Sequence, residues 1–249
     1  MGYWLIIRRY EKHEGDEMTD PDALASLEKR VTELARQVAR LEDAHAVKCL
    51  HYKYGYYIDK CLYDEAVMLF ADSGEVRFLN GIYRGRTGIR RLYCDWFRKY
   101  FTGGMNGPLR GLLLDHLMLQ DIVDVADDGL SAKGRFRCVL QAGCHESMSE
   151  PIPNFPRQFW EAGIYENTYV REGGVWKIKC LHYDMFWRAD YHQGWANSVV
   201  HLTPITRAYP DDPNGPDELL PEAPRTWPET RVVPFHYPHP ITGKRWERP

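Results

Sequence analysis

The sequence lacks the local signatures of several common enzyme classes. It has no glycine-rich phosphate loop, no GxGxxG between a strand and a helix, no HExxH and no GxSxG. Its six cysteines form no CxxC pair and no tight metal-ligand spacing. We therefore expect free thiols in a reducing cytoplasm, no metal site and no cofactor.

Long apolar runs and blocks of like charge are also missing. The opening MGYWLIIRRY has an apolar run too short to span a bilayer, and its basic residues follow the run, which is the wrong side for a secretory signal. The net charge is −3 and the charges are scattered. We expect a cytoplasmic protein with no membrane or nucleic-acid partner, which leaves small molecules and proteins as partners.

The first part of the chain predicts a helix with a heptad repeat. Residues 1–19 are interpreted as a flexible extension, with Met18 as an alternative start, and residues 20–45 as a helix leading into the domain. The heptad seam consists of Leu24, Leu27, Val31, Leu34, Val38 and Leu41. This helix either lies on its own domain or forms an oligomer.

The middle and the end of the chain differ in apolar periodicity and in proline content. Residues 46–199 predict helices, one of them continuing through residue 63, and then apolar alternation at 113–126, 130–145, 158–172 and 175–188. This order predicts an α+β fold with helices on one face of a curved, mostly antiparallel sheet. Residues 200–249 hold eleven of the sixteen prolines and read as a tail that wraps over its own domain or a neighbour.

The segment YKYGYYIDKCLYD gathers five tyrosines around Asp59. On a helix, Tyr52, Tyr56, Asp59 and Tyr63 share one stripe, which either faces water or a subunit, or forms the wall of a site. In the second case the pKa of the Asp59 carboxyl could rise towards a range useful for acid–base work. Lys60 is interpreted as a surface lysine.

Three of the predicted strands place further polar groups at the ends of apolar rows. Alternation puts His116 on a face with Met118, a pattern that also fits a hydrogen-bonded core histidine. In the last strand His182 shares a face with Trp176 and Ile178, and in the strand before it Gly163, Tyr165 and Asn167 share a face.

The order of these parts resembles a known family. The tyrosine-rich segment with Asp59 is followed by IYRGRTGIRRLY, then DHLMLQDIVDVADDGLSAKGRF with His116 near its start, and finally AGIYENTYVREGGVWKIKCLHYDMFW. Over roughly residues 40–190 this order is similar to the SnoaL-like members of the nuclear transport factor 2-like superfamily.

The resemblance implies a cone-shaped α+β barrel around one deep pocket, in which cofactor-free lyases such as scytalone dehydratase use tyrosine, aspartate and histidine. Asp59 and His116 match two of these groups. Gln141 stands where that dehydratase has a second histidine, and Tyr165 stands near its pocket asparagine, so the chain departs from that enzyme. The tail and the tyrosine-rich helix look more like the formaldehyde-lyases of lignin-derived diarylpropanes.

These observations predict a lyase for a small aromatic hydroxy compound, acting by dehydration or by formaldehyde release from a diarylpropane-1,3-diol to give a stilbene. An isomerase or cyclase, and a binding subunit such as an oxygenase small subunit, stay open as alternatives. We expect a homo-oligomer, a trimer rather than a dimer. The predicted catalytic residues are Asp59 as the base, helped by Tyr56, and His116 as the acid that protonates the departing hydroxyl. The predicted substrate-binding residues are Tyr52, Tyr63, Gln141, Tyr165, His182 and Trp187.

Overall fold

The computed structural model describes residues 21–148, 150, 152–197, 203–222 and 225–247. The chain divides into two compact units, Met1–Leu41 and Glu42–Pro249. The predicted extension, with Met18, lies outside the described residues.

The described part of the first unit is helical throughout. It is the beginning of α1, which runs over Pro21–Asp59. The six residues of the predicted heptad seam are each between 50% and 71% exposed. Within this unit, therefore, no described residue covers the seam.

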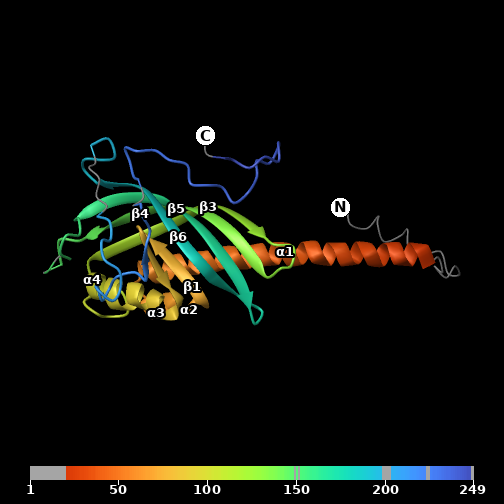
Figure 1. Ribbon diagram of the computed structural model, residues 1–249, viewed down its shortest axis with the longest axis horizontal. Helices are drawn as coiled ribbons and strands as arrows, with labels where there is room; N and C mark the ends of the chain where they lie inside the picture. Colours follow the sequence, from red (N-terminus) through yellow and green to blue (C-terminus); the bar gives the residue numbers. More distant parts are fainter. Residues whose placement is uncertain (1–20, 149, 151, 198–202, 223–224, 248–249) are drawn as a thin grey trace, which may run out of the picture. The chain divides into compact units, whose positions relative to one another are not determined.

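The second unit has an α+β fold, as the sequence predicts (Figure 1). Its sheet has the strand order β3-β4-β5-β6-β1-β2-β7, and neighbouring strands are antiparallel except for the parallel pair β1 and β6. The elements after α1 are α2 (Tyr63–Met68), β1 (Phe70–Phe78), β2 (Gly81–Arg84), α3 (Gly85–Arg90), the π-helix η2 (Arg91–Phe97), α4 (Arg98–Thr102), β3 (Leu112–Val125), β4 (Ser131–Cys144), β5 (Gln158–Glu172), β6 (Val175–Asp190) and β7 (Glu218–Leu219).

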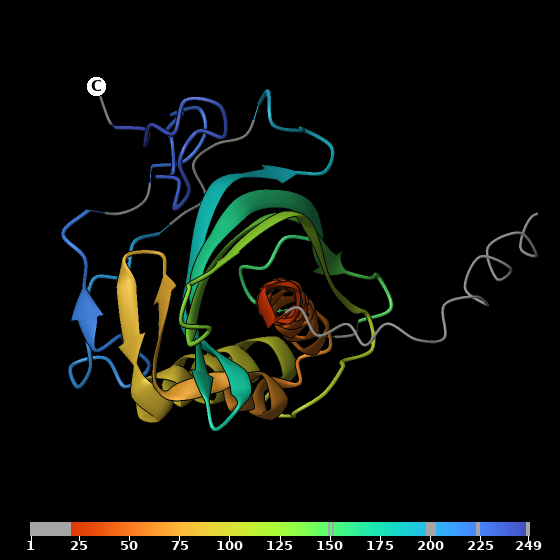
Figure 2. The ribbon, with the colours of Figure 1, turned by 90° about the vertical axis from the view of Figure 1, so that its right-hand side faces the viewer.

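The sheet curves around the part of α1 that belongs to this unit. Figure 2 looks along the helix and shows the strands β3 to β6 bending over it. The buried positions of the helix recur at steps of three and four, which is the period of one helix face: Asp43, Val47, Leu50, His51, Tyr54 and Ile58. This face therefore packs on the concave side of the sheet, where the core lies.

A buried carboxylate fastens the helix to the far end of β5 and β6. Asp43 accepts hydrogen bonds from Trp176 Nε1 at 2.9 Å and from Arg171 Nη1 at 2.9 Å. Both donors flank the tight turn at Gly173 and Gly174, whose φ angles of 58° and 81° suit glycine. The turn and the carboxylate thus fix the depth at which α1 sits in the sheet.

Successive side chains of each strand point to opposite faces of the sheet, but bulges in β3 and β6 interrupt this alternation. The predicted strand ranges are correct within one or two residues. In β3 the register shifts between Leu119 and Ile122, with Gln120 at a φ of 47°. In β6 it shifts twice, opposite Thr168/Tyr169 and Ala162/Gly163. Residues beyond a bulge change faces, because each shift by one residue turns the side chain over.

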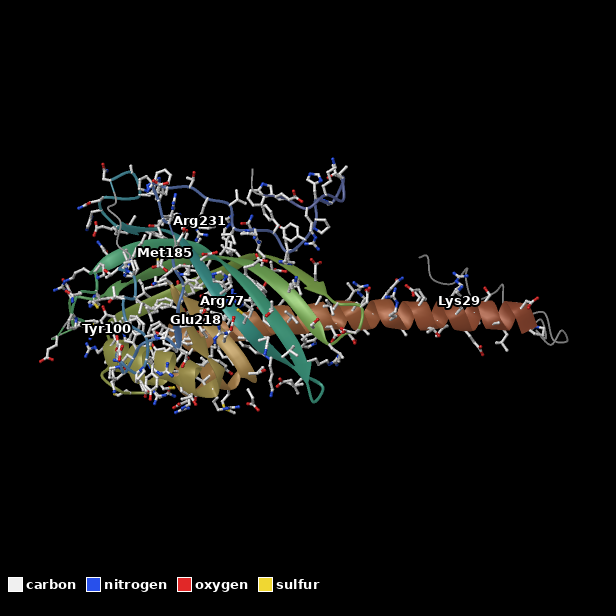
Figure 3. The ribbon with its side chains drawn as sticks, in the orientation of Figure 1. Lys29, Arg77, Tyr100, Met185, Glu218 and Arg231 are labelled. Atoms are coloured by element: carbon white, nitrogen blue, oxygen red, sulfur yellow. The ribbon has the colours of Figure 1, made fainter. Side chains whose placement is uncertain are left out.

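The described parts of the tail pack on the second unit at two places. The first part extends the sheet as β7, which pairs with β2. The second part runs over the convex side, where Arg231, labelled in Figure 3, donates a 2.5 Å hydrogen bond to Asp184, and Arg135 donates to the carbonyl oxygen of Val233 at 2.9 Å. These contacts lie on the side of the sheet opposite to α1.

Candidate active site

Asp59 and His116 form a tight buried pair. His116 Nδ1 lies 2.6 Å from Asp59 Oδ1, and the backbone N–H of His116 donates to the same oxygen at 3.0 Å. The side chains are only 8% and 13% exposed. Because Asp59 binds Nδ1, the other ring nitrogen of His116, Nε2, is left to interact with a ligand.

The end of α1 and one inner position of β3 create this contact. Asp59 is the last residue of α1, and the turn after it places Cys61 at a φ of 52°. His116 lies on the inner face of β3, between Leu114 and Met118. Met118 in turn contacts Gly55 of the helix, where a Cβ would lie 3.0 Å from its methyl carbon. A glycine at this position lets the helix approach β3 closely.

Hydrogen-bonded tyrosines surround the buried helix face. The hydroxyls of Tyr54 and Tyr93 lie 2.8 Å apart, and the Tyr165 ring meets the Tyr54 ring edge-on at 6.2 Å. Burial raises the pKa of all three phenols above the ordinary value, so they act as neutral hydrogen-bonding groups at physiological pH. Together they give the interior an apolar lining with polar tips.

A second buried carboxyl, Glu161, lies on the same inner surface. It is 6% exposed, and Tyr183 donates a 3.1 Å hydrogen bond to its Oε1. Burial is the main reason why the pKa of this carboxyl is raised, against the opposing charge of Arg188. Glu161 is not among the residues predicted from the sequence, although it lies two residues before Gly163 and thus belongs to the row that Gly163 and Tyr165 share.

The tyrosines of the predicted stripe do not gather at the Asp59–His116 pair. Tyr56, a predicted catalytic residue, is 74% exposed, so the described structure does not bring it to the pair. Tyr52 instead donates a 2.7 Å hydrogen bond to Asp121, and burial together with this contact raises its pKa to about 12. Tyr63 is buried but starts α2, because α1 ends at Asp59 and does not continue through residue 63.

Three predicted substrate-binding residues lie on the outer face. Gln141 of β4 pairs on that face with Trp160 of the neighbouring strand β5. His182 Nε2 lies 3.8 Å from Asp184, the residue that holds the tail, and Trp187 packs on Trp195. His182 lies there because the bulge in β6 opposite Thr168/Tyr169 reverses the alternation that places it with Trp176 and Ile178 in the sequence.

Tyr165, in contrast, does lie on the inner face, where its ring is 4.7 Å from that of Tyr183. Lys60 is exposed. No cluster of three or more potential metal ligands occurs among the described residues. In the same part of the chain, no helix is both long and apolar enough to cross a bilayer.

The family follows from the sequence match together with this fold. The model of the SnoaL-like domain matches residues 39–182, which is more than half of the chain. The protein therefore belongs to the SnoaL-like domain family. The match covers both Asp59 and His116 and stops before the tail.

Solved structures similar to this one are distant in sequence. A provisionally assigned scytalone dehydratase from Novosphingobium aromaticivorans is 20% identical, with a TM-score of 0.49, over 69% of this chain and 99% of that chain. The type 2 hexachlorocyclohexane dehydrochlorinase LinA is 18% identical, with a TM-score of 0.49, over 68% and 97%. ActVI-ORFA from Streptomyces coelicolor is 17% identical, with a TM-score of 0.43, over 57% and 95%. No curated protein matches the sequence.

Proposed function

We propose that the chain is a cofactor-independent lyase that acts on a small aromatic hydroxy compound by acid–base elimination. The observation that carries the proposal is the buried Asp59–His116 pair at the concave face of the sheet. A histidine held at Nδ1 by a carboxylate presents its other nitrogen as a proton acceptor, and the carboxylate stabilises the imidazolium that forms. His116 is then the base and Asp59 orients it, which reverses the roles expected from the sequence.

The surroundings favour an apolar aromatic substrate. Tyrosine and phenylalanine rings make up much of the buried core on the concave side of the sheet, including Tyr54, Tyr165 and Phe136. A ring-bearing substrate would be held by such rings, while phenolic hydroxyls orient its polar groups. The finer version of the proposal is formaldehyde release from a lignin-derived diarylpropane-1,3-diol, or simple dehydration, either of which would give a conjugated product.

The test measures turnover of diarylpropane-1,3-diols and of aryl β-hydroxy ketones. New ultraviolet absorbance reports conjugation, and a colorimetric assay reports formaldehyde. We expect His116→Gln and Asp59→Asn to reduce kcat/KM by roughly 10²–10⁴-fold, as for other positioned acid–base groups. His182→Gln is the matched control, because it makes the same change on the outer face.

Three outcomes bear on the proposal. Loss in both inner variants with an active control supports it. Wild-type activity in either inner variant would contradict the assignment of the pair. Rearrangement of the substrate without loss of water or formaldehyde would identify an isomerase or cyclase instead. Treatment with a chelator followed by dialysis should leave activity unchanged, and activity that is lost and then restored by a metal ion would contradict the cofactor-free mechanism.

A further inference from the structure

The base needs an acid on the same surface, and Glu161 is placed to supply one. It lies on the inner face of β5, where the buried Phe159 and Tyr165 also lie. Elimination of a hydroxyl requires a proton for the leaving oxygen, since hydroxide is a poor leaving group. In the Asp59–His116 pair the histidine is committed to accepting a proton and the aspartate to holding the histidine.

The strand register puts Glu161 in one row with His116. His116 of β3 pairs with Leu140 of β4, Leu140 pairs with Glu161 of β5, and Glu161 pairs with Arg188 of β6. Neighbouring strands are ~4.8 Å apart, so the backbones of His116 and Glu161 are separated by about 10 Å. Side chains that reach inward from both strands can therefore flank one small molecule.

The groups around Glu161 connect it to the pair. Tyr183 hydrogen-bonds to Oε1, while Arg188 Nε remains 3.9 Å from Oε2, beyond hydrogen-bonding distance. Burial, and after it the charges of Glu161 and Asp59, raise the pKa of the Cys138 thiol, so both carboxyl groups act on this buried residue of β4. The charge of His116 also acts on Glu161, but in the opposite direction, since it lowers the pKa that burial raises.

We propose that Glu161 is the general acid of the site and that the substrate is accordingly one whose leaving group is a hydroxyl. The inference rests on the function proposed above. His116 Nε2 takes a proton from the substrate carbon, the electron pair of that C–H bond forms the new C=C bond, and the C–O bond breaks. Glu161 gives its proton to the departing oxygen, which leaves as water. Solvent then removes the proton from His116 and returns one to Glu161.

A purely structural role is the competing explanation. In that case Glu161 would be a carboxylate that balances the charge of Arg188, which stacks on Phe159 at 3.9 Å. The two roles differ in the protonation state of Glu161 at neutral pH and in the dependence of the reaction on the leaving group.

The kinetic test compares two ketones that give the same product. β-Hydroxypropiophenone loses water and needs an acid, whereas β-chloropropiophenone loses chloride, which leaves without a proton. Initial rates of phenyl vinyl ketone formation, corrected for the uncatalysed rate, are measured for the wild type, Glu161→Gln, His116→Gln and Glu166→Gln. Glu166 is the matched control, because it lies in the same strand on the outer face, where it binds Arg135.

Glu161→Gln should lose ~10²-fold or more on the hydroxy ketone and much less on the chloro ketone, and His116→Gln should lose activity on both. Equal losses on the two ketones in Glu161→Gln, or no loss, would overturn the acid role. If the wild type turns over neither ketone, the result counts against a lyase function on aryl ketones with a β leaving group. The acid role of Glu161 is then decided by the second test alone.

The second test needs no substrate. With glutamate labelled by ¹³C at the side-chain carboxyl, the resonance absent from Glu161→Gln identifies Glu161 in the full-length protein. We expect this resonance to remain that of a neutral acid at pH 7, where exposed glutamates are ionised. A Glu161 carboxyl that titrates together with the exposed glutamates would overturn the proposal, whatever the ketones show.

Discussion

The attachment of the tail can be tested at Asp217, which receives hydrogen bonds from two different elements. Its Oδ1 accepts from Arg91 Nη2 at 2.9 Å, and its Oδ2 accepts from the backbone N–H of Arg84 at 2.7 Å. Arg91 also donates to the carbonyl oxygen of Gly215 at 2.8 Å and lies over the ring of Tyr209. Replacing Asp217 with alanine removes both bonds and leaves the Arg91 guanidinium without its counter-charge.

The magnitude follows from the burial of the pair. The Arg91 side chain is 7% exposed and that of Asp217 is 29% exposed. Removing one partner of a fully buried ion pair costs about 3–5 kcal/mol, and the partial exposure of Asp217 lowers our expectation to about 2–3 kcal/mol. For a chain of this size each kcal/mol shifts Tm by about 2–4 °C, so Asp217→Ala should lower Tm by about 5–10 °C.

Thermal unfolding followed by circular dichroism measures this shift. The matched control is Asp72→Ala, which removes a carboxylate 2.5 Å from Arg86 in a pair whose side chains are 77% and 49% exposed. An exposed pair contributes little to stability, so this variant should melt close to the wild type. Equal shifts in the two variants would refute the reasoning that the tail is held by a buried contact. Faster hydrogen exchange of the Arg84 amide should accompany the loss.

Further predictions concern acid stability, the tail and assembly. Burial lowers the pKa of His51 to about 3. Below pH 6.5 this histidine therefore binds a proton in the unfolded state but not in the folded state. The free energy of unfolding falls as the pH drops, by about 2 kcal/mol between pH 6.5 and 5. In urea titrations at several pH values, His51→Phe should remove this part of the pH dependence of the unfolding free energy. An unchanged pH dependence would count against the role of His51. Cutting the chain after Leu202 should lower Tm and weaken assembly, and a truncated chain that melts and assembles like the intact one would make the tail dispensable. Light scattering should show a homo-oligomer, a trimer rather than a dimer. A monomer at about micromolar concentration would contradict both the trimer and the dimer. The variant Leu34→Lys then tests whether the exposed heptad seam takes part in assembly.

Local pattern was sufficient to predict the elements that carry the candidate site. Alternation with period two located the strands that hold His116 and Tyr165, and the α+β order of helices and strands was correct. Such patterns depend on the nearest neighbours in sequence, because each side chain must face either the core or solvent. Glu161 follows the same two-residue alternation as Gly163 and Tyr165, so extending that row by one step towards the N-terminus would have found it.

The sequence left open whether the tyrosine stripe faces water or a subunit or forms the wall of a site, and local pattern does not decide between the two. The buried helix face passes through His51, Tyr54 and Ile58, while Tyr56 faces outward. A tyrosine-rich helix offers polar-tipped apolar groups on several sides, so composition does not identify the side that packs. The sheet decides it, because Gly55 is the position at which the helix meets Met118 of β3.

The sequence by itself determined the kind of fold, the order of its parts and the residue types available for acid–base chemistry, since these depend on hydrophobic period and turn residues along the chain. The tertiary structure decided which of those residues meet. Asp59 and His116 are 57 positions apart and come together only when α1 lies in the curved sheet. The bulges that turn His182 away from that surface arise from pairing between strands, and the spacing of residues within one strand does not reveal them.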